Sequence, residues 1–412
     1  MSKHISKNQR NEFHAWASRV ALGVCCGSLS ALGCSQTNDT DPISPETPDS
    51  GAPDAREADA APPGPVTLAE KYAPLFTIGA AVDPGSQVTH ADLLIEHFNS
   101  VTSENEMKFE SLQRVEGTFT YAAADSLVVF AEQNGMNVRG HALVWHRQTP
   151  AWMFVDAQGA PATEELLFQR LRSHISNVVG HFRGKVQAWD VVNEAMMDDG
   201  ELRTATEEQE TQRSPWHGIA AERYIAEAFR AANEADPDAK LFYNDYYNYI
   251  PVKHQAIYEL LRGLLEQGVP VHGVGLQAHV NIQPSTLETN QAFHQTPENM
   301  EAAIELYASL GLEVHITEMD LSVYIPGMMY MPDMFYTPET FTDAVAAQQA
   351  ERYRAFFEVY RRQADAITNV TLWGVADDNT WLSEFSSGRQ DFPLLFDRNH
   401  QRKPAFDAIV DF

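Results

Sequence analysis

Residues 188–194 read Ala-Trp-Asp-Val-Val-Asn-Glu, a short apolar run that ends in polar side chains. Apolar runs of this length are typical of strands buried on both faces of a parallel sheet. Seven further runs share the pattern, and they are Phe76–Val82, Ser100–Glu106, Val138–Trp145, Lys240–Tyr246, Gly273–His279, Glu313–Asp320 and Thr371–Asp377. We therefore expect eight strands, most of them with a polar cluster at the carboxyl end.

Amphipathic helices are expected between these runs, because apolar residues recur there at helical spacing. Two segments read as helix starts, since Thr296-Pro297-Glu298 and Thr337-Pro338-Glu339 each place a capping residue before Pro at the first helical position. Eight strands alternating with helices over roughly 345 residues predict an α/β fold, a single (β/α)8 TIM barrel, at residues 68–412. A doubly wound open sheet is the alternative.

The charge balance limits the classes of partner. The 412 residues include 29 Lys and Arg against 57 Asp and Glu, which gives a formal net charge of -28. Nucleic acids and anionic membranes are bound through positive potential, so neither is an expected partner of this chain. A neutral polysaccharide is compatible with this charge.

The N-terminus reads as an export signal over residues 1–34. Basic residues precede an apolar run, Val20 to Gly33, that is too short to span a bilayer. The run ends at Cys34 in a sequence that resembles the lipobox of bacterial lipoproteins, so Cys34 is a candidate lipidation site. Ordinary signal cleavage nearby is the alternative. We expect a secreted protein or a lipoprotein anchored at the bacterial surface, with no other membrane contact.

Residues 35–67 are predicted to be a disordered, acidic, Pro-rich linker. Seven prolines and seven acidic residues lie between Ser35 and Pro65, with almost no large apolar side chain. All three cysteines, Cys25, Cys26 and Cys34, precede this segment. The barrel is therefore predicted to contain neither a disulfide nor a thiolate metal site.

Two long segments follow predicted strands at positions where a barrel carries substrate-shaping loops. Residues 200–217 are polar and charged, and residues 325–340 carry four methionines. Each segment is interpreted as a wall of a substrate cleft or, alternatively, as a variable surface excursion.

Polar side chains gather where the predicted strands end. In a (β/α)8 barrel these ends converge on one site, so side chains far apart in sequence are expected to share one pocket. Glu194 ends the fourth run, and Glu318 lies near the end of the seventh. Glycoside hydrolysis requires two such carboxyl groups, one protonated to release the leaving oxygen and one ionised to attack the anomeric carbon.

The residues around this pair suit a sugar substrate. Trp145, Trp373 and Trp381 offer flat apolar faces for sugar rings, and Asn193 is placed to hydrogen-bond a hydroxyl group. His279 and Asp320 are predicted to hydrogen-bond Glu318 and to keep it ionised.

Six motifs occur in a fixed order, and together they resemble glycoside hydrolase family 10, the xylanases of the 4/7 barrel superfamily. They are Glu-Asn-Glu-Met-Lys at 104–108, Arg-Gly-His-Ala-Leu-Val-Trp-His at 139–146, Trp-Asp-Val-Val-Asn-Glu at 189–194, Gly-Leu-Gln-Ala-His at 275–279, Ile-Thr-Glu-Met-Asp at 316–320 and Trp-Gly-Val at 373–375. The match extends from Gly79 to about Phe406.

The resemblance implies an endo-β-1,4-xylanase that retains the anomeric configuration. Glu194 would be the acid/base and Glu318 the nucleophile, with carboxyl groups roughly 5–5.5 Å apart. Xylan and xylo-oligosaccharides are the expected partners, and a monomer without cofactor or metal is expected. The family positions implied to bind substrate are Glu104, Asn105, Lys108, His141, Trp145, Gln148, Gln277, Trp373 and Trp381.

The sequence departs from the family pattern at three positions. Phe109 occupies a position where the family more often has Trp. Tyr247 replaces the Asn that commonly follows Asn-Asp-Tyr in the family, and Asp378 occupies a position where a basic or amide residue is frequent. These departures affect the detail of the subsites, since none of them removes a catalytic group.

Three alternatives remain open from sequence. A metal-dependent barrel hydrolase could use His141, His146, His279 and His315 as ligands, and full activity in EDTA would exclude it. A glycan-binding lipoprotein would capture a polysaccharide without cleaving it. A cellulase or mixed-glucanase is the nearest enzymatic rival, because glucose and xylose differ by a hydroxymethyl group that a pocket discriminates only modestly.

Overall fold

The computed structural model describes residues 66–412, except for residues 289, 325–336, 338–339 and 386–389. The predicted export signal, Cys34 and nearly all of the predicted linker lie outside the described residues, as does most of the 325–340 segment. The chain divides into the units Met1–Ala61 and Pro62–Phe412, and the described part belongs to the second. None of the described helices combines the length and the apolar character that a membrane span requires.

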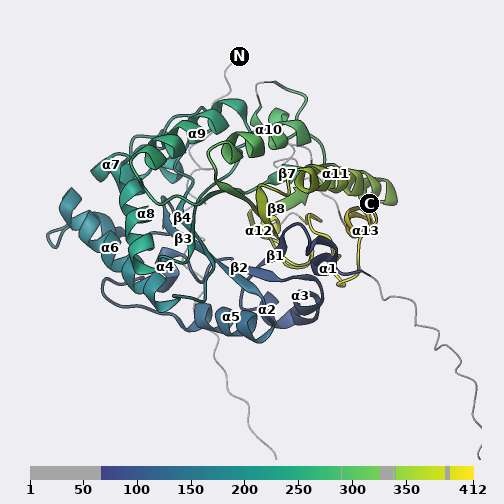
Figure 1. Cartoon of the computed structure of the whole chain (residues 1–412), viewed down its shortest axis with the longest axis horizontal. Helices are drawn as coiled ribbons and strands as arrows, with labels where there is room; N and C mark the ends of the chain where they lie inside the picture. The colour runs from purple at the N-terminus through teal and green to yellow at the C-terminus, as the bar shows by residue number, and fades with distance from the viewer. Residues whose placement is uncertain (1–65, 289, 325–336, 338–339, 386–389) are drawn as a thin grey trace, which may run out of the picture. The chain divides into compact units, whose positions relative to one another are not determined.

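Eight parallel strands close into a barrel, which confirms the predicted (β/α)8 fold and excludes an open sheet. Neighbouring strands pair in the order β1-β2-β3-β4-β5-β6-β8-β9, and β9 pairs with β1 to close the ring (Figure 1). The short β7 extends the sheet beside β8. The strands are β1 (Thr77–Val82), β2 (Ser100–Ser103), β3 (Asn137–Trp145), β4 (Ala188–Asn193), β5 (Lys240–Asp245), β6 (Gly273–Leu276), β7 (His279–Asn281), β8 (Glu313–Ser322) and β9 (Ile367–Leu372).

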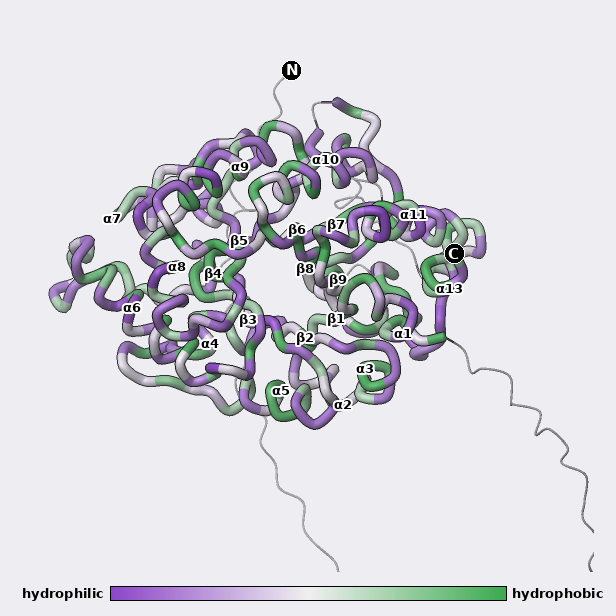
Figure 2. Tube along the Cα trace, viewed as in Figure 1, coloured by the Kyte–Doolittle hydropathy of each residue, from purple (hydrophilic) through white to green (hydrophobic). Residues whose placement is uncertain are grey.

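Helices surround the barrel (Figure 1), and hydrophilic and hydrophobic residues alternate along them (Figure 2). This alternation is expected where one helix face packs on the strands and the other faces water. The helices are α1 (Leu68–Tyr72), α2 (Ser86–Thr89), α3 (Ala91–His97), α4 (Phe109–Leu112), α5 (Ala122–Gln133), α6 (Glu164–His181), α7 (Pro215–Ala220), α8 (Arg223–Ala235), α9 (Pro251–Glu266), α10 (Pro297–Ala308), α11 (Asp343–Arg362), α12 (Trp381–Phe385) and α13 (Pro404–Val410), with short 3-10 turns at Ala151–Phe154, Glu210–Gln212 and Gln291–His294.

One predicted helix start is confirmed, and two of the three residues of the other, Pro338 and Glu339, lie outside the described residues. Helix α10 begins at Pro297, and the Thr296 side chain accepts a hydrogen bond from the backbone of Asn299. Helix α11 begins at Asp343, after the cap residue Thr342. The Thr337 carbonyl accepts a hydrogen bond from the N–H of Phe341 at 2.9 Å.

Three predicted strands differ from the structure by three residues or more at one or both ends. Strand β2 ends at Ser103 rather than at Glu106. The eighth barrel strand is Ile367–Leu372 rather than Thr371–Asp377, so Trp373 lies just past its end. The predicted run Gly273–His279 is divided into β6 and β7, because Ala278 between them has a φ of 57°. This break turns the chain so that His279 begins a short strand beside β8.

Candidate active site

A pocket of about 580 Å³ lies where the carboxyl ends of the strands converge. Most of the predicted site residues line it, as expected for a barrel of this type. Those that do are Lys108, His141, Trp145, Asn193, Glu194, Gln277, His279, Glu318, Asp320, Trp373 and Trp381. The structure therefore brings together side chains from six of the eight barrel strands and their following loops.

Glu194 directly follows the last residue of β4, in the left-handed region of the backbone with a φ of 57°. The indole Nε1 of Trp145 donates to Glu194 Oε2 at 2.7 Å, and Gln277 Nε2 donates to Oε1 at 3.1 Å. The backbone N–H of Glu194 donates to the carbonyl of Asn244 at 2.9 Å. The carboxyl group is thus fixed in direction at the wall of the pocket.

Glu318 lies within β8 and is only 5% exposed. Asn244 Nδ2 donates to its Oε1 at 2.8 Å, and His279 Nε2 lies 3.2 Å from its Oε2. Burial raises the pKa of Glu318, but the hydrogen bond from His279, the positive potential of His141 and His279 and the Asn244 amide together hold it below its usual value. Glu318 is therefore ionised at neutral pH.

His279 links Glu318 to a second carboxylate. Its Nδ1 lies 2.9 Å from Asp320 Oδ2, which also accepts from Trp381 Nε1 at 2.7 Å. Burial lowers the pKa of His279, yet Asp320 and Glu318 outweigh burial and raise it to about 10. A protonated His279 therefore donates to both carboxylates, and it connects Asp320 to Glu318 by hydrogen bonds.

Amide side chains connect the surroundings of the two glutamates. Asn193 Oδ1 accepts from Asn244 Nδ2 at 2.9 Å and from Gln277 Nε2 at 3.3 Å. Its own Nδ2 is buried and has no hydrogen-bond partner among the described residues, although Asn193 lines the pocket. A buried donor of this kind calls for a partner from the ligand, which fits the predicted hydrogen bond to a sugar hydroxyl.

Comparison with known proteins agrees with this arrangement. The sequence model of glycosyl hydrolase family 10 matches residues 67–412. The chain belongs to glycosyl hydrolase family 10.

Individual family 10 relatives match over almost the whole described chain. An endo-1,4-beta-xylanase of Geobacillus stearothermophilus is 44% identical over 350 residues, which are 84% of this chain and 98% of that protein. The crystal structure of xylanase XynB from Paenibacillus barcinonensis in complex with a conduramine derivative is 43% identical, with a TM-score of 0.75 over 84% of this chain and 98% of that one. A mutant structure in complex with xylotriose is 42% identical, with a TM-score of 0.75 over 84% and 100% of the two chains.

Four predicted substrate-binding residues of this family 10 chain contact one another in two pairs at the pocket. The buried His141 is held by Asp190, whose Oδ2 lies 2.9 Å from His141 Nδ1, and its ring meets Trp373 edge to face at 5.4 Å. Lys108 is buried, contrary to the usual exposure of a lysine, and its Nζ lies 5.2 Å from the ring centre of Trp145. Burial lowers the pKa of Lys108, while Glu318 and other nearby carboxylates oppose this effect.

Glu104, Asn105 and Gln148 are not among the residues that line the pocket. Asn105 supports the lining indirectly, because its Oδ1 accepts from Lys108 Nζ at 3.0 Å. Gln148 lies in a loop with a φ of 45°, and its carbonyl accepts from the backbone of Glu110. A direct substrate role for these three residues stays a prediction, as does the separation of the two catalytic carboxyl groups.

The four histidines proposed as metal ligands do not form a ligand group in the described part of the chain. His315 accepts a hydrogen bond from Arg139 Nε at 3.0 Å and stacks on Phe242. The register of β8 against β9 shifts between Ile316 and Met319. Thr317 and Glu318 consequently both bond to the Asn244 side chain.

Asn244 lies within the predicted run Lys240–Tyr246, and the sequence assigned it no role. Its position at the end of β5 could have indicated a place in the site, whereas its hydrogen bond to Glu318 depends on closure of the barrel.

Arg203 was not predicted as a site residue, since nothing in its polar loop distinguishes it. The Arg203 guanidinium donates to the Glu194 carbonyl at 2.9 Å and to Tyr246 Oη at 3.1 Å. Within residues 200–217 Gln212 also lines the pocket, so this segment forms part of the cleft wall.

Proposed function

We propose that the chain hydrolyses internal β-1,4-xylosidic bonds of xylan with retention of configuration. The observation that carries this proposal is the different surroundings of two carboxyl groups in one pocket. Glu318 is held ionised by His279 and Asn244, as a nucleophile requires, and Glu194 is oriented by Trp145 and Gln277. The names of the relatives, endo-1,4-beta-xylanase and xylanase, indicate the same substrate for this chain.

In the first step, a carboxylate oxygen of Glu318 attacks the anomeric carbon while Glu194 gives its proton to the leaving glycosidic oxygen. The C–O bond to the leaving sugar breaks, and an ester between the xylosyl unit and Glu318 forms. In the second step, Glu194 takes a proton from water as the water oxygen attacks the same carbon. Glu318 leaves as a carboxylate, and two inversions give net retention.

The aromatic residues of the pocket suit a xylan chain. Trp145, Trp373 and Trp381 line the pocket, and Tyr246 and Tyr247 also contribute aromatic surface to its lining. Sugar rings present apolar C–H faces and hydroxyl edges, so aromatic faces and buried amides bind them together. Xylo-oligosaccharides are proposed as ligands on the same grounds, and the xylotriose complex of a family 10 relative supports this.

The test uses the two alanine variants with azide, a small nucleophile that fits the space left by a carboxyl group. Glu318→Ala should lose activity on an activated xylobioside on the order of 10⁴-fold or more. Azide should then restore turnover and give an α-glycosyl azide, since only one inversion occurs. Glu194→Ala with azide should give the β-glycosyl azide, because its glycosyl-enzyme still forms.

The surface variant Glu259→Ala serves as the control, since Glu259 pairs with Arg262 on α9. It should behave like the parent protein in every assay. Hydrolysis by Glu318→Ala at the parent rate without azide would contradict the nucleophile role. An α-azide product from Glu194→Ala would contradict the assignment of acid/base.

We further propose that residues 1–34 direct export and that residues 35–67 tether the barrel to its attachment point. The support is the sequence alone, through the basic and apolar segments, the resemblance to a lipobox at Cys34 and the acidic, Pro-rich composition of the linker. Such a tether would let a surface-anchored enzyme reach an insoluble polysaccharide. We also propose that the enzyme is a monomer.

A further inference from the structure

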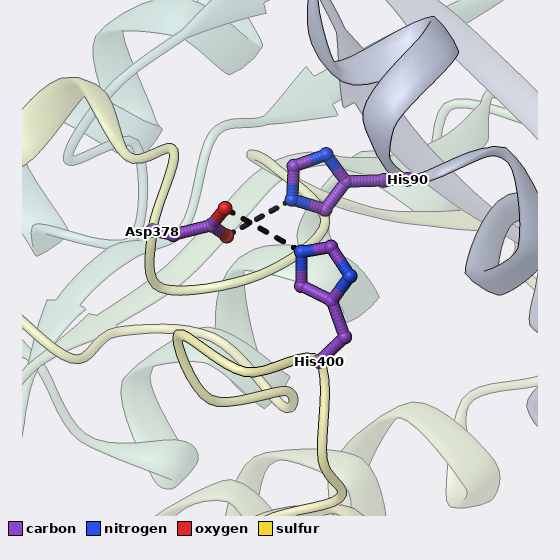
Figure 3. A group of neighbouring side chains, drawn as sticks. All are labelled: His90, Asp378 and His400. Atoms are coloured by element: carbon purple, nitrogen blue, oxygen red, sulfur yellow. Dashed lines mark hydrogen bonds and ion pairs between the residues drawn. The ribbon is translucent and has the colours of Figure 1, made fainter.

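His90, Asp378 and His400 form a cluster outside the proposed active site, and no role in xylan hydrolysis involves them. His90 lies between α2 and α3, Asp378 follows β9, and His400 lies in the loop before α13. Their side chains converge on the Asp378 carboxylate, as Figure 3 shows. His90 Nε2 lies 2.9 Å from Asp378 Oδ1, and His400 Nε2 lies 3.4 Å from Oδ2.

The hydrogen bonds around His90 fix its tautomer. Thr89 Oγ1 donates its single proton to the Gly85 carbonyl at 3.1 Å, so it can only accept from His90 Nδ1 at 2.8 Å. The Nδ1 of His90 therefore carries a proton, and in neutral His90 the lone pair is on Nε2. Nε2 and Asp378 Oδ1 lie 2.9 Å apart, so an imidazole nitrogen and a carboxylate oxygen face the same small space.

The contact between His90 Nδ1 and Thr89 Oγ1 is typical of metal-binding histidines, which usually donate their second ring N–H to a neighbouring oxygen. His400 is held by a tight loop, in which Asp397 Oδ1 accepts from the N–H groups of Asn399 and Gln401 at 2.8 Å each. One ligand atom from each cluster residue lies within 4.8 Å of the other two. Tetrahedral zinc holds its ligands about 3.4 Å apart, given metal–ligand distances of roughly 2.0–2.2 Å, so small rotations would complete the site.

We propose that His90, Asp378 and His400 bind one zinc ion, with water as the fourth ligand. Two imidazoles and one carboxylate form a donor set for zinc or a similar transition metal, whereas calcium and magnesium take oxygen ligands. The side chains of Asp378 and His400 are 33% and 34% exposed, which gives the ion and its water a path from solvent. The net charge of -28 attracts cations to the surface.

The zinc ion would cross-link segments of the chain at the position where the barrel closes. β1 pairs with β9 at this seam, and the cluster joins residues that follow each of these strands to the C-terminal loop. None of the three residues lines the substrate pocket, so the ion stabilises the fold and takes no part in catalysis. The expectation that Asp378 affects the detail of the subsites is therefore not met, because its carboxylate faces His90 and His400 instead. The inference is independent of the proposed function.

The test is zinc binding by the full chain, prepared without a histidine tag and dialysed against EDTA and then against metal-free buffer. Cys25, Cys26 and Cys34 are replaced by serine in the parent and in all variants, so that thiolates do not compete for zinc. Calorimetric titration with zinc chloride should show one site per chain. Zinc at about 100 times its Kd should raise the thermal unfolding midpoint by roughly 3–6 °C, and calcium should not.

Asp378→Asn and His400→Gln should each weaken zinc binding at least about 10-fold and remove the rise in the unfolding midpoint. The control His181→Gln removes an exposed histidine that lies 2.6 Å from Asp125, a pair without a second histidine, and should bind zinc as the parent does. Unchanged xylan hydrolysis by metal-free His400→Gln will show that this variant is folded. Absence of binding by the parent, or equal binding by parent and both cluster variants, would overturn the proposal, as would an equal effect of calcium.

Discussion

The charge of Glu318 depends on the side chains that contact it. A buried carboxylate is costly unless hydrogen bonds and opposite charge compensate for lost hydration. His279 supplies both, because its raised pKa keeps it protonated, and Asp320 fixes the orientation of its ring. The nucleophile is thus prepared before the substrate binds.

Replacement of His279 by Gln is expected to change the pH dependence of catalysis. Without the hydrogen bond and charge of His279, burial should raise the pKa of Glu318, so the acidic limb of the kcat/KM profile should move to higher pH. The profile of each variant is measured on a xylo-oligosaccharide between pH 3 and 8. The control is His181→Gln, whose acidic limb should coincide with that of the parent.

Stability provides a second readout for the same variant. A histidine whose pKa is raised from 6.5 to about 10 stabilises the fold fully below pH 6.5, and this contribution is lost as the pH rises through 10. The difference in unfolding free energy between the parent and His279→Gln should therefore shrink from pH 6.5 to pH 10. A constant difference, together with an unmoved acidic limb, would contradict the role of His279.

The residue types of the site could largely be predicted, but their pairings could not. Glu194, Glu318 and their Trp and His neighbours stand out because polar groups at the ends of apolar runs are unusual. Asn244 and Arg203 contact the catalytic residues through distances set by strands and loops far apart in sequence. No local pattern contains that information.

Among the elements, β3 and β4 pack so closely that one position between them has no space for a side chain. A Cβ on Gly140 would overlap the ring of the fully buried Trp189. Gly263 on α9 is the opposite case, because a Cβ there would meet open space. Both positions have ordinary negative φ values, so the same substitution differs only in packing.

Gly140→Ala is therefore expected to destabilise the protein by about 2–3 kcal/mol through overpacking. Gly263→Ala should stabilise it by roughly 0.5–1 kcal/mol, because alanine favours the helix. Thermal unfolding of the two variants beside the parent measures both effects. Equal midpoints for the two variants would show that the close contact at Trp189 is absent.

The limits of elements were predicted less well than their order. The eighth strand was placed too late because Thr368 and Asn369 look unlike strand interior. In the barrel, Asn369 Nδ2 donates to Thr77 Oγ1 of β1 at 2.7 Å, so a partner from the other end of the chain accounts for its burial. The break between β6 and β7 likewise depends on the positive φ of Ala278. A positive φ is not predictable at an alanine, because alanine rarely adopts it.

At the scale of the whole molecule, ring closure brings the two glutamates to one pocket. Glu194 follows the fourth barrel strand and Glu318 lies on the seventh, and only a closed barrel sends both side chains into the same space. The alternation of strands and helices predicted a barrel but left an open sheet as the alternative, and the pairing of β9 with β1 decides for closure. The N-terminal segments were likewise predicted from composition, and they lie outside the described residues.

The attachment of the molecule to a membrane is predicted to depend on Cys34. If this residue is lipidated after export, the full chain should sediment with membranes, and Cys34→Ala should move to the soluble fraction. Cell fractionation with an antibody to the barrel measures the distribution, and Cys26→Ala provides the matched control. An unchanged distribution of Cys34→Ala would contradict lipidation.

The covalent intermediate on Glu318 gives the most direct test of the proposed chemistry. An activated 2-deoxy-2-fluoro-xylobioside should form the glycosyl-enzyme quickly and release it slowly. The fluorine destabilises the oxocarbenium-like transition states of both steps, and the activated leaving group restores the rate of the first step only. Intact mass spectrometry should then show one added xylobiosyl unit per chain, and peptide mapping should place it on Glu318. Labelling of another residue, or the absence of any adduct together with an α-configured first product by NMR, would contradict the double displacement.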